Sequence, residues 1–532
     1  MNNNRTISDF PKSFPVTLEH LFPLKLQQIL QDAHTQFNHR RIELLEERRK
    51  NQRLYDQGQV PTFLNQNSVA VQSDWKIAPI PLELKKRRVE ITGPINSAKM
   101  VINMLSENEA GIIADTAMLD FEDSMKPSWP NVLNGFLNAI GVAKGDLSFQ
   151  TPQKTYQLNI KKMAFPMVRV RGLHLSESNF KIKNEFISAG LLDLVTCFFH
   201  TAKIYQAKGQ VTKFYIPKCE GHQEAKWWDD LFEFLEKSMD VPQGTLRCTF
   251  LIETLPAAFH IEEILYATKN HITALNVGRW DKIFSDIKTL KNHPDRIMAD
   301  RASLTMTTPW MEQYAKRVID LCHKRGAFAM GGMAAFTPGK DEALRKEQTQ
   351  KVTIDKAREF TWGHDGCWVS HPYFIGPALT CFTKDNQIDK RVENFNPLAD
   401  LLPQGTGQKT LQGLRTNIRV GIAYLQGWNQ DIGCVSWDNL MEDLATLEIS
   451  RAQVWQWLRH EIKLSTGEMV TKELVEKIFA EELEKILQES TYSPEMKESF
   501  QRAKRDAQEI FLEKDLKEFL SLQSNIYLKE DV

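Results

Sequence analysis

Two carboxylates are placed where a chain could hold a hard metal ion beside a small acid. Glu253 follows the apolar run 249–252, and Asp281 follows a second apolar run, 274–277, through the turn 278–280. A parallel α/β barrel brings strand ends of this kind to one rim. Because Mg²⁺ favours one or two protein carboxylates, with water and substrate oxygens in its other positions, the pattern indicates a magnesium site. Two strand-end acids in unrelated ion pairs would show the same pattern, so the residues alone leave both open.

Length and composition describe an ordinary globular chain. It has 532 residues, 42% of them hydrophobic and 25% charged, with a net charge of −1. We therefore expect no nucleic acid and no membrane among its partners. The start of the chain has no apolar signal region, and no stretch of 18 apolar residues occurs. The seven cysteines form no CxxC pair, which argues against structural zinc and disulfides, and we expect a cytoplasmic protein.

The N-terminal part of the chain is polar and helical in pattern. Residues 23–56 predict one long charged helix. Its basic residues, Arg41 and Arg48 among them, alternate with acids such as Glu43 and Glu47. We interpret this alternation as a solvated helix face.

Eight short β-rich runs then alternate with helical stretches, which predicts an α/β fold of the (β/α)₈ TIM-barrel type. The runs are residues 89–91, 118–121, 167–170, 214–216, 249–252, 274–277, 327–330 and 367–370. A doubly wound sheet is the alternative, but no GxGxxG follows the first strand. Residues 145–159 resemble a hairpin-like insertion. Beyond residue 400 the pattern is almost wholly helical, with a clear helix start at Ser493-Pro494.

Eleven motifs in order resemble malate synthases, specifically the A-type of the bacterial glyoxylate cycle. They are WKIAPIP (75–81), RRVEITGP (87–94), DFED (120–123), VRVRG (168–172), LIETLPAAF (251–259), NVGRWDKIFS (276–285), NHPDR (292–296), GGMAA (331–335), GHDGCWVSHP (363–372), NIRVGIAYL (417–425) and MEDLATLEISRAQVWQW (441–457). The resemblance implies an N-terminal helical clasp at 1–80, a barrel at 81–400 with a small α/β insertion near 135–160, and an all-helical C-terminal plug at 401–532.

The resemblance also implies the reaction and its main residues. Malate synthases condense acetyl-CoA with glyoxylate, using Mg²⁺, and hydrolyse malyl-CoA to malate and CoA. Glu253 and Asp281 match the metal ligands, and Arg169 matches the arginine that stabilises the enolate oxygen. Asp443 matches the general base, although its neighbour Glu442 is nearly interchangeable with it on sequence alone. The oligomeric state expected from such relatives is a monomer or a small homo-oligomer.

Further positions match the family with less specificity. Gly278, Arg279 and Trp280 resemble the glyoxylate-binding loop, in which a glycine lets backbone N–H groups approach a carboxylate, although Trp280 could equally be a core aromatic. Glu122 and Asp123 are candidates for holding metal-bound water, or for a structural ion pair. Pro338 resembles a residue at the CoA entrance, next to Phe336-Thr337, where many relatives carry Gln-Ile.

Arg171 is the local rival of Arg169. Strand alternation would put both arginines on one face, so periodicity cannot choose between them, and the resemblance favours Arg169 as the catalytic residue. Arg171 is then a structural arginine or one that binds a CoA phosphate.

Two other functions compete with the synthase. A citryl-CoA or malyl-CoA lyase uses a similar barrel to cleave rather than condense, but the shorter lyases lack the extension that carries Asp443. A catalytically inactive barrel kept as a scaffold is disfavoured because Arg169, Glu253, Asp281 and Asp443 are all present.

Overall fold

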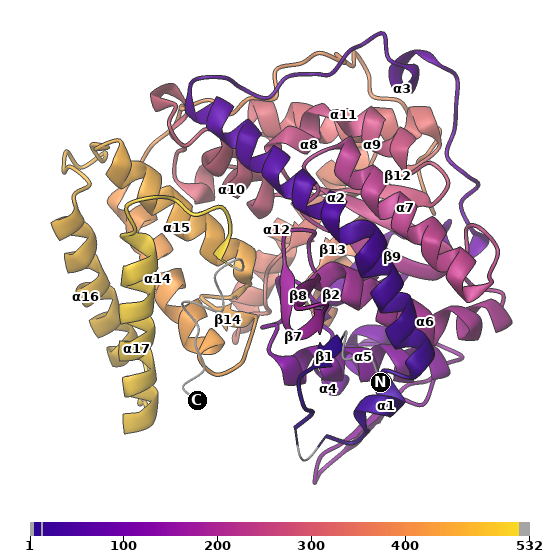
Figure 1. The fold of residues 1–532 in the computed structure, drawn as a ribbon. Coiled ribbons are helices and arrows are strands. Elements are labelled where there is room, and N and C mark those ends of the chain that lie inside the picture. The colour runs from indigo at the N-terminus through magenta and orange to yellow at the C-terminus, as the bar shows by residue number, and fades with distance from the viewer. Residues whose placement is uncertain (1–4, 12–13, 521–532) are drawn as a thin grey trace. The chain divides into compact units, whose positions relative to one another are not determined.

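Eight parallel strands close into a barrel in the computed structural model, which describes residues 5–11 and 14–520 (Figure 1). The strands are β2 (Val89–Pro94), β3 (Thr116–Asp120), β6 (Phe165–Arg169), β9 (Thr212–Ile216), β10 (Leu246–Ile252), β11 (Ile272–Val277), β12 (Phe328–Ala334) and β13 (Gly366–Val369). Neighbours along the chain are neighbours in the barrel, and β13 pairs with β2 to close it. The predicted (β/α)₈ barrel is confirmed, and each of the eight predicted runs overlaps one of these strands.

The barrel strands are almost continuously apolar because both of their faces are covered. All seven residues of β10 and all six of β11 are buried. One interior layer is filled by Met118, Met167, Tyr215, Leu251 and Trp368, which come from five different strands. The interior is therefore a packed core, and a substrate meets the barrel at a rim rather than inside it.

Helices follow most of the barrel strands. They are α4 (Ala98–Leu105), α5 (Trp129–Lys144), α6 (Ala189–Ala207), α7 (His222–Met239), α8 (Leu255–Phe259), α9 (Ile261–Ala267), α10 (Trp280–Thr289), α11 (Pro309–Arg325), α12 (Glu342–Trp362) and α13 (Ile375–Cys381). Short 3₁₀ turns lie at Leu82–Leu84, Pro294–Arg296, Arg301–Ser303 and Pro372–Phe374. Two small sheets accompany the barrel: β1 (Arg5–Ile7), β7 (Ser176–Ile182) and β8 (Glu185–Ser188) form one, and β4 (Ser148–Gln150) with β5 (Thr155–Gln157) forms the other. The antiparallel β4–β5 pair is the hairpin predicted within residues 145–159.

The chain divides into two compact units. The barrel unit comprises Met1–Arg48, Phe63–Gly278 and Lys316–Pro397, and the C-terminal unit comprises Arg49–Thr62, Arg279–Ala315 and Leu398–Val532. All eight barrel strands belong to the first, and α10 belongs to the second. The predicted boundaries at residues 80 and 400 are divisions along the sequence, and they stay predictions; the two end regions also include residues outside the described ranges.

Helices dominate the C-terminal unit, which contains α14 (Leu411–Trp428), α15 (Leu444–Arg459), α16 (Lys472–Gln488) and α17 (Pro494–Phe511). Tyr424, Trp457, Phe479 and Phe511 are among the residues of its core. Gly421 allows close packing, since a Cβ there would lie 2.6 Å from the Phe511 ring. Helices α14, α16 and α17 accordingly lie side by side (Figure 1). As predicted, Ser493 caps α17 with Pro494 as its first residue.

The prediction of an all-helical C-terminal region is wrong in one place. β14 (Val435–Trp437) and β15 (Leu440–Glu442) form an antiparallel hairpin just before α15. Its two-residue loop, Asp438-Asn439, has φ values of 46° and 64°. Asp and Asn tolerate the left-handed region that such tight hairpin loops require, so this dipeptide was a usable turn signal.

The long N-terminal helix α2 (Leu24–Asp56) forms as predicted, but its basic residues are not all solvated. Arg41 is 4% exposed and Arg48 is 5% exposed. Their side chains reach loops of the barrel more than 130 residues away along the chain. The predicted solvated face is therefore wrong for these two arginines, because their guanidinium groups find backbone carbonyl acceptors that the local sequence does not reveal.

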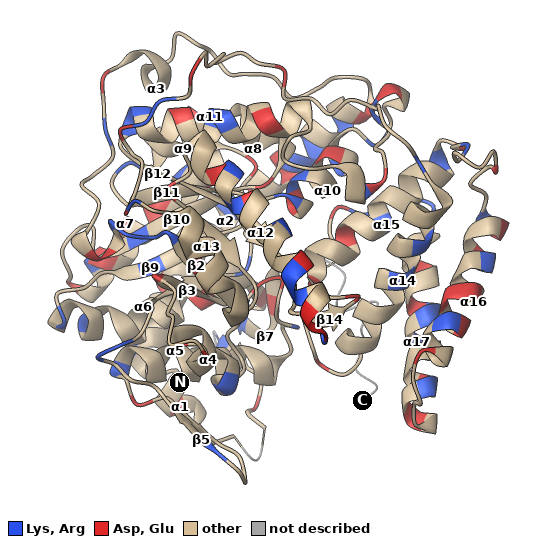
Figure 2. Cartoon of the chain, turned by 180° about the vertical axis from the view of Figure 1, so that it is seen from behind, with Lys and Arg blue, Asp and Glu red and all other residues tan. Residues whose placement is uncertain are grey.

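Charged residues of both signs are interspersed in the C-terminal unit, as Figure 2 shows along α16 and α17. Arg415 of α14, for example, pairs with Glu482 of α16 at 2.7 Å. Within the described part of the chain, none of the helices has the length and apolarity needed to cross a membrane.

A buried histidine ties the start of β11 to α7. His271 is fully buried, with Nδ1 2.7 Å from Asp229 Oδ1 and Nε2 3.2 Å from Glu236 Oε2. Burial disfavours the charged ring, but the hydrogen bonds to the two carboxylates outweigh it and raise the pKa of His271 to about 9. The protonated ring thus stabilises the fold fully below its ordinary pKa, near 6.5, and this contribution is lost as pH rises through about 9.

We expect His271→Gln to lower the melting temperature at pH 6.5, because two buried carboxylates lose their cation. The wild-type melting temperature should fall between pH 6.5 and 9.5, and the gap between wild type and variant should narrow over the same range. Differential scanning calorimetry of both proteins at several pH values measures this. A gap that stays constant with pH would show that the His271 charge is not what stabilises this contact.

Candidate active site

The guanidinium of Arg169 is held by a carboxylate from the neighbouring strand. Arg169 ends β6 and Asp120 ends β3, and the two are register partners. Nε and Nη2 of Arg169 donate to the two Asp120 oxygens at 2.6 Å each. Burial alone would raise the pKa of Asp120, but the guanidinium of Arg169 holds it below the usual range. This two-point contact fixes the plane of the guanidinium.

Lys218 joins the ends of three strands. It lies two residues beyond β9, and its Nζ donates to Glu122 and, at 2.6 Å, to Asp123, both just after β3. Its backbone N–H donates to Glu253 Oε1, just after β10, at 2.8 Å. Arg169 also approaches this group, with Nη1 3.3 Å from Glu122 Oε2. The barrel therefore brings Arg169, Glu122, Asp123 and Glu253 into one cluster.

The cluster holds more negative than positive side chains. It comprises the carboxylates of Asp120, Glu122, Asp123 and Glu253 and the cations of Arg169 and Lys218, all of them 6% exposed or less. If all six side chains were ionised, the cluster would carry a net charge of −2. Burial, and next the carboxylate of Asp123, raise the pKa of Glu122 well above its usual value. The donor set therefore fits a divalent cation, which would balance this surplus.

Glu253 belongs to the barrel unit and Asp281 to the C-terminal unit, and their pairing as ligands of one magnesium ion stays a prediction. No cluster of three or more His, Cys, Asp or Glu side chains suited to a metal occurs within residues 5–11 and 14–520. The predicted ligand set, which is the two carboxylates of Glu253 and Asp281, is smaller than such a cluster.

The side chain of Glu253 leaves room only for a glycine at position 278. A Cβ at position 278 would lie 2.7 Å from the Glu253 Cβ and 3.2 Å from its Oε2. From the sequence, we predicted that this glycine lets the backbone approach a substrate carboxylate. The structure adds a second reason, which is that residue 278 packs directly on the predicted metal ligand.

We expect Gly278→Ala to weaken Mg²⁺ binding and turnover together while leaving the fold intact. The added methyl must displace the Glu253 side chain, and overpacking of this kind costs about 1–3 kcal/mol. Isothermal titration with Mg²⁺ and a melting curve of the same variant separate the two effects. Wild-type Mg²⁺ affinity in Gly278→Ala would show that Glu253 can shift without consequence.

Two residues of the predicted glyoxylate loop, Arg279 and Trp280, lie at the start of α10 in the C-terminal unit. Arg279 is the N-cap residue, and Asp281 lies in the first helical turn, where a negative charge is favourable. The Arg279 guanidinium lies 4.1 Å from the centre of the Trp280 ring, and the Arg301 guanidinium lies 5.7 Å from it. Trp280 is partly exposed, so it is not a core aromatic.

Asp443 and Glu442 occupy different environments, although the sequence could not separate them. Glu442 ends β15, is 2% exposed and lies 3.8 Å from Arg301. Burial raises its pKa, and Arg301 opposes this. Asp443 is partly exposed and caps α15, with Oδ1 accepting from the Thr446 N–H at 3.3 Å. Glu442 thus has a buried structural partner, whereas Asp443 lies partly exposed at the start of α15.

Arg171 lies apart from the Arg169 cluster. It donates to Asp193 at 2.7 and 2.9 Å and to Glu177 at 2.7 Å, and it is 3% exposed. Because β6 ends at Arg169, the strand alternation used to compare the two arginines does not extend to Arg171. The structure places Arg171 in a buried ion-pair group, and its CoA role stays a prediction.

Pro338, the other predicted CoA contact, lies partly buried between β12 and α12.

The sequence reasoning missed Asp120, Lys218 and Arg301. Asp120 is the first residue of the Asp-Phe-Glu-Asp motif, and its strand-end position was the available signal. Lys218 follows the fourth barrel strand, so the rule that strand ends carry chemistry could also have found it. No local signal marks Arg301, whose contacts with Trp280, Glu442 and Ser450 all come from distant segments.

Known proteins resemble this chain along its length. Three family models match. The model of the malate synthase N-terminal domain matches residues 30–69, that of the malate synthase TIM barrel domain matches residues 166–402, and that of the malate synthase C-terminal region matches residues 408–528. Malate synthase A of Escherichia coli (strain K12) is 40% identical over 533 residues, covering 98% of this chain and 99% of that protein. The malate synthase of Myxococcus xanthus (strain DK1622) is 42% identical over 482 residues, covering 89% and 88%. The solved lead(II) complex of Haloferax volcanii malate synthase is 14% identical with a TM-score of 0.44, covering 79% of this chain and 98% of that one, too distant to support any conclusion.

Proposed function

Because this chain belongs to the malate synthase family, we propose that it condenses acetyl-CoA with glyoxylate and hydrolyses the resulting malyl-CoA to malate and CoA. The buried cluster at the strand ends of the barrel unit carries the proposal. It sets a fixed guanidinium beside a surplus of negative charge that fits a divalent cation. The condensation needs both parts, since a small acid must be held and an enolate oxygen must be stabilised.

Malate synthases use a divalent metal ion, and we propose Mg²⁺ for this chain, held by Glu253 and Asp281. Bound there, Mg²⁺ supplies Lewis-acid polarisation of the glyoxylate aldehyde. Lys218 holds one oxygen of Glu253 through its backbone N–H, which orients the carboxylate. The backbone at Gly278 and the side chains of Arg279 and Trp280 bind glyoxylate.

Asp443 takes a proton from the methyl group of acetyl-CoA. The negative charge then develops on the thioester oxygen, where the guanidinium of Arg169 stabilises it. The two-point contact with Asp120 keeps that guanidinium in place, so it need not reorganise as the charge forms. The enolate carbon attacks the aldehyde carbon, and the resulting alkoxide takes up a proton, which balances the one that Asp443 removed. Water then adds to the thioester carbonyl, the carbon–sulfur bond breaks, and CoA leaves as a thiol. We also propose Pro338 and Arg171 as contacts of CoA, on the basis of the sequence resemblance alone.

A thiol reagent that reports free CoA tests the function. We expect CoA release only when acetyl-CoA, glyoxylate and Mg²⁺ are all present. Release of glyoxylate from malyl-CoA without net condensation would identify a lyase instead, and no reaction in either direction would identify a scaffold. The monomeric or small homo-oligomeric state and the cytoplasmic location stay predictions.

A further inference from the structure

We propose that Arg48 of the N-terminal helix α2 is a positioning residue for the metal ligand Glu253, acting through the backbone of Lys218. The proposal rests on the proposed function, because it takes Glu253 as a ligand of the divalent metal. It assigns a specific task to a helix that the reaction described above does not use.

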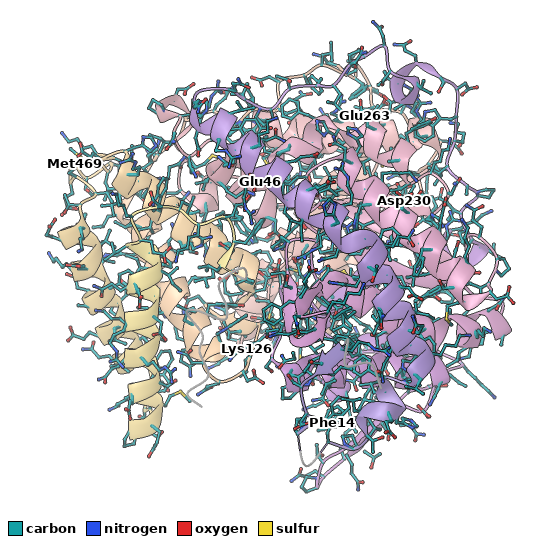
Figure 3. All side chains as sticks on the ribbon, viewed as in Figure 1. Phe14, Glu46, Lys126, Asp230, Glu263 and Met469 are labelled. Atoms are coloured by element: carbon teal, nitrogen blue, oxygen red, sulfur yellow. The ribbon has the colours of Figure 1, made fainter. Side chains whose placement is uncertain are left out.

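Arg48 is buried, as Arg41 is, on a helix whose other arginines and lysines are exposed. Its side chain is 5% exposed, whereas Glu46, labelled on α2 in Figure 3, is exposed. Arg40, two turns earlier, is also exposed and pairs with Glu43 on the same helix at 3.0 Å. Burying an arginine is costly unless its donors are satisfied, so the partners of Arg48 indicate what its burial achieves.

Arg48 holds the segment that follows β9. Its Nη2 donates to the Lys218 carbonyl at 2.7 Å. The same guanidinium makes a two-point contact with Glu224 of α7, with Nη2 2.7 Å from Oε2. That oxygen of Glu224 also accepts the Glu220 N–H at 2.8 Å. Arg48 and Glu224 thus bind the backbone at both ends of the three-residue segment 218–220, which we call the β9 loop.

The β9 loop has a conformation that needs external support. Lys218 has φ of 51°, in the left-handed region that costs a non-glycine residue about 1 kcal/mol or more. In this conformation its N–H points to Glu253 Oε1 and its Nζ reaches Asp123. A third contact, from the Thr254 hydroxyl to the Cys219 carbonyl at 2.8 Å, ties the same loop to the residue after Glu253. Releasing the Lys218 carbonyl would let the backbone relax, and the N–H would turn away from Glu253.

Arg41 provides a matched comparison on the same helix. It is 4% exposed and donates to two backbone carbonyls, those of Leu173 at 2.6 Å and Leu175 at 2.8 Å. These carbonyls belong to the segment after β6, not to the β9 loop. Removal of Arg41 should therefore disturb the packing of α2 about as much as removal of Arg48, without touching the support of Glu253.

The test is titration of the full-length protein with MgCl₂ alone, followed calorimetrically. Outer contacts that orient a metal ligand typically change affinity by about 10–100-fold. We expect Arg48→Met to weaken Mg²⁺ binding by about that factor. Arg41→Met and the exposed-residue control Arg40→Met should bind Mg²⁺ as the wild type does.

Arg48→Met leaves the buried Glu224 carboxylate without its cation, which could prevent folding. The double variant Arg48→Met/Glu224→Gln removes both charges and still lacks the donor to the Lys218 carbonyl, so it should fold and bind Mg²⁺ equally weakly. Wild-type affinity in this folded double variant, or an equal loss in Arg41→Met, would overturn the proposal.

Glu253→Gln in the same titration separates this proposal from the proposed function. If Glu253→Gln binds Mg²⁺ as the wild type does, the metal assignment fails, and the role of Arg48 fails with it. If Glu253→Gln loses binding while the double variant keeps it, Glu253 remains the ligand, and only the role of Arg48 is rejected.

Discussion

Glu253→Gln should abolish turnover without destabilising the metal-free protein. The variant loses one of the two proposed carboxylate ligands, so turnover should fall by more than the 10–100-fold typical of contacts that only orient a ligand, that is, by more than about 10²-fold. The buried cluster already carries two more acids than bases. Neutralising one of them relieves repulsion, so the melting temperature without Mg²⁺ should equal or exceed that of the wild type.

Mg²⁺ should raise the melting temperature of the wild type, because a ligand that binds only the folded state stabilises it. Glu253→Gln should show almost no such rise. Asp281→Asn should behave alike, except that it also loses a charge in the first turn of α10, worth about 0.3–1 kcal/mol. A variant that turns over near the wild-type rate at ordinary Mg²⁺, or that gains the full stabilisation from Mg²⁺, would remove that residue from the metal site.

The barrel was predictable because its strands are covered on both faces and so appear as short apolar runs bounded by polar residues. Strand-end positions then predicted which residues share a rim. Arg169 and Glu253 meet in one cluster for this reason, although they are 84 residues apart in sequence. The same rule would have included Asp120 and Lys218, had each strand end been considered.

The burial of Arg41 and Arg48 could not be predicted in this way. The pattern of α2 is polar on most sides, and a buried arginine looks the same in sequence as a solvated one. What distinguishes them is a carbonyl acceptor on a remote loop, such as Lys218 for Arg48, and acceptors of this kind leave no trace in composition or periodicity. The sequence could not distinguish Glu442 from Asp443 for a similar reason. What separates them is the contact of Glu442 with Arg301, which lies far away along the chain.

Asp443→Asn should leave Mg²⁺ and glyoxylate binding intact and stop abstraction of the acetyl-CoA methyl proton. The substitution is mild for the fold, because Asn is as good an N-cap as Asp and its side-chain oxygen can still accept from Thr446. The step can be followed alone by NMR, as exchange of the methyl protons of acetyl-CoA in D₂O with pyruvate as an unreactive glyoxylate mimic. Loss of a general base typically costs about 10²–10⁴ in rate, and we expect exchange to fall by at least that factor.

Two variants show whether the loss belongs to Asp443 itself. Glu442→Gln should keep most of the exchange, because Glu442 is buried against Arg301 and serves the fold. Arg169→Lys keeps the positive charge but loses the two-point contact with Asp120, so exchange should fall while Mg²⁺ binding persists. If Asp443→Asn exchanges protons as fast as the wild type and Glu442→Gln does not, the base is Glu442, and its contact with Arg301 would then tune its proton affinity rather than only hold the β14–β15 hairpin.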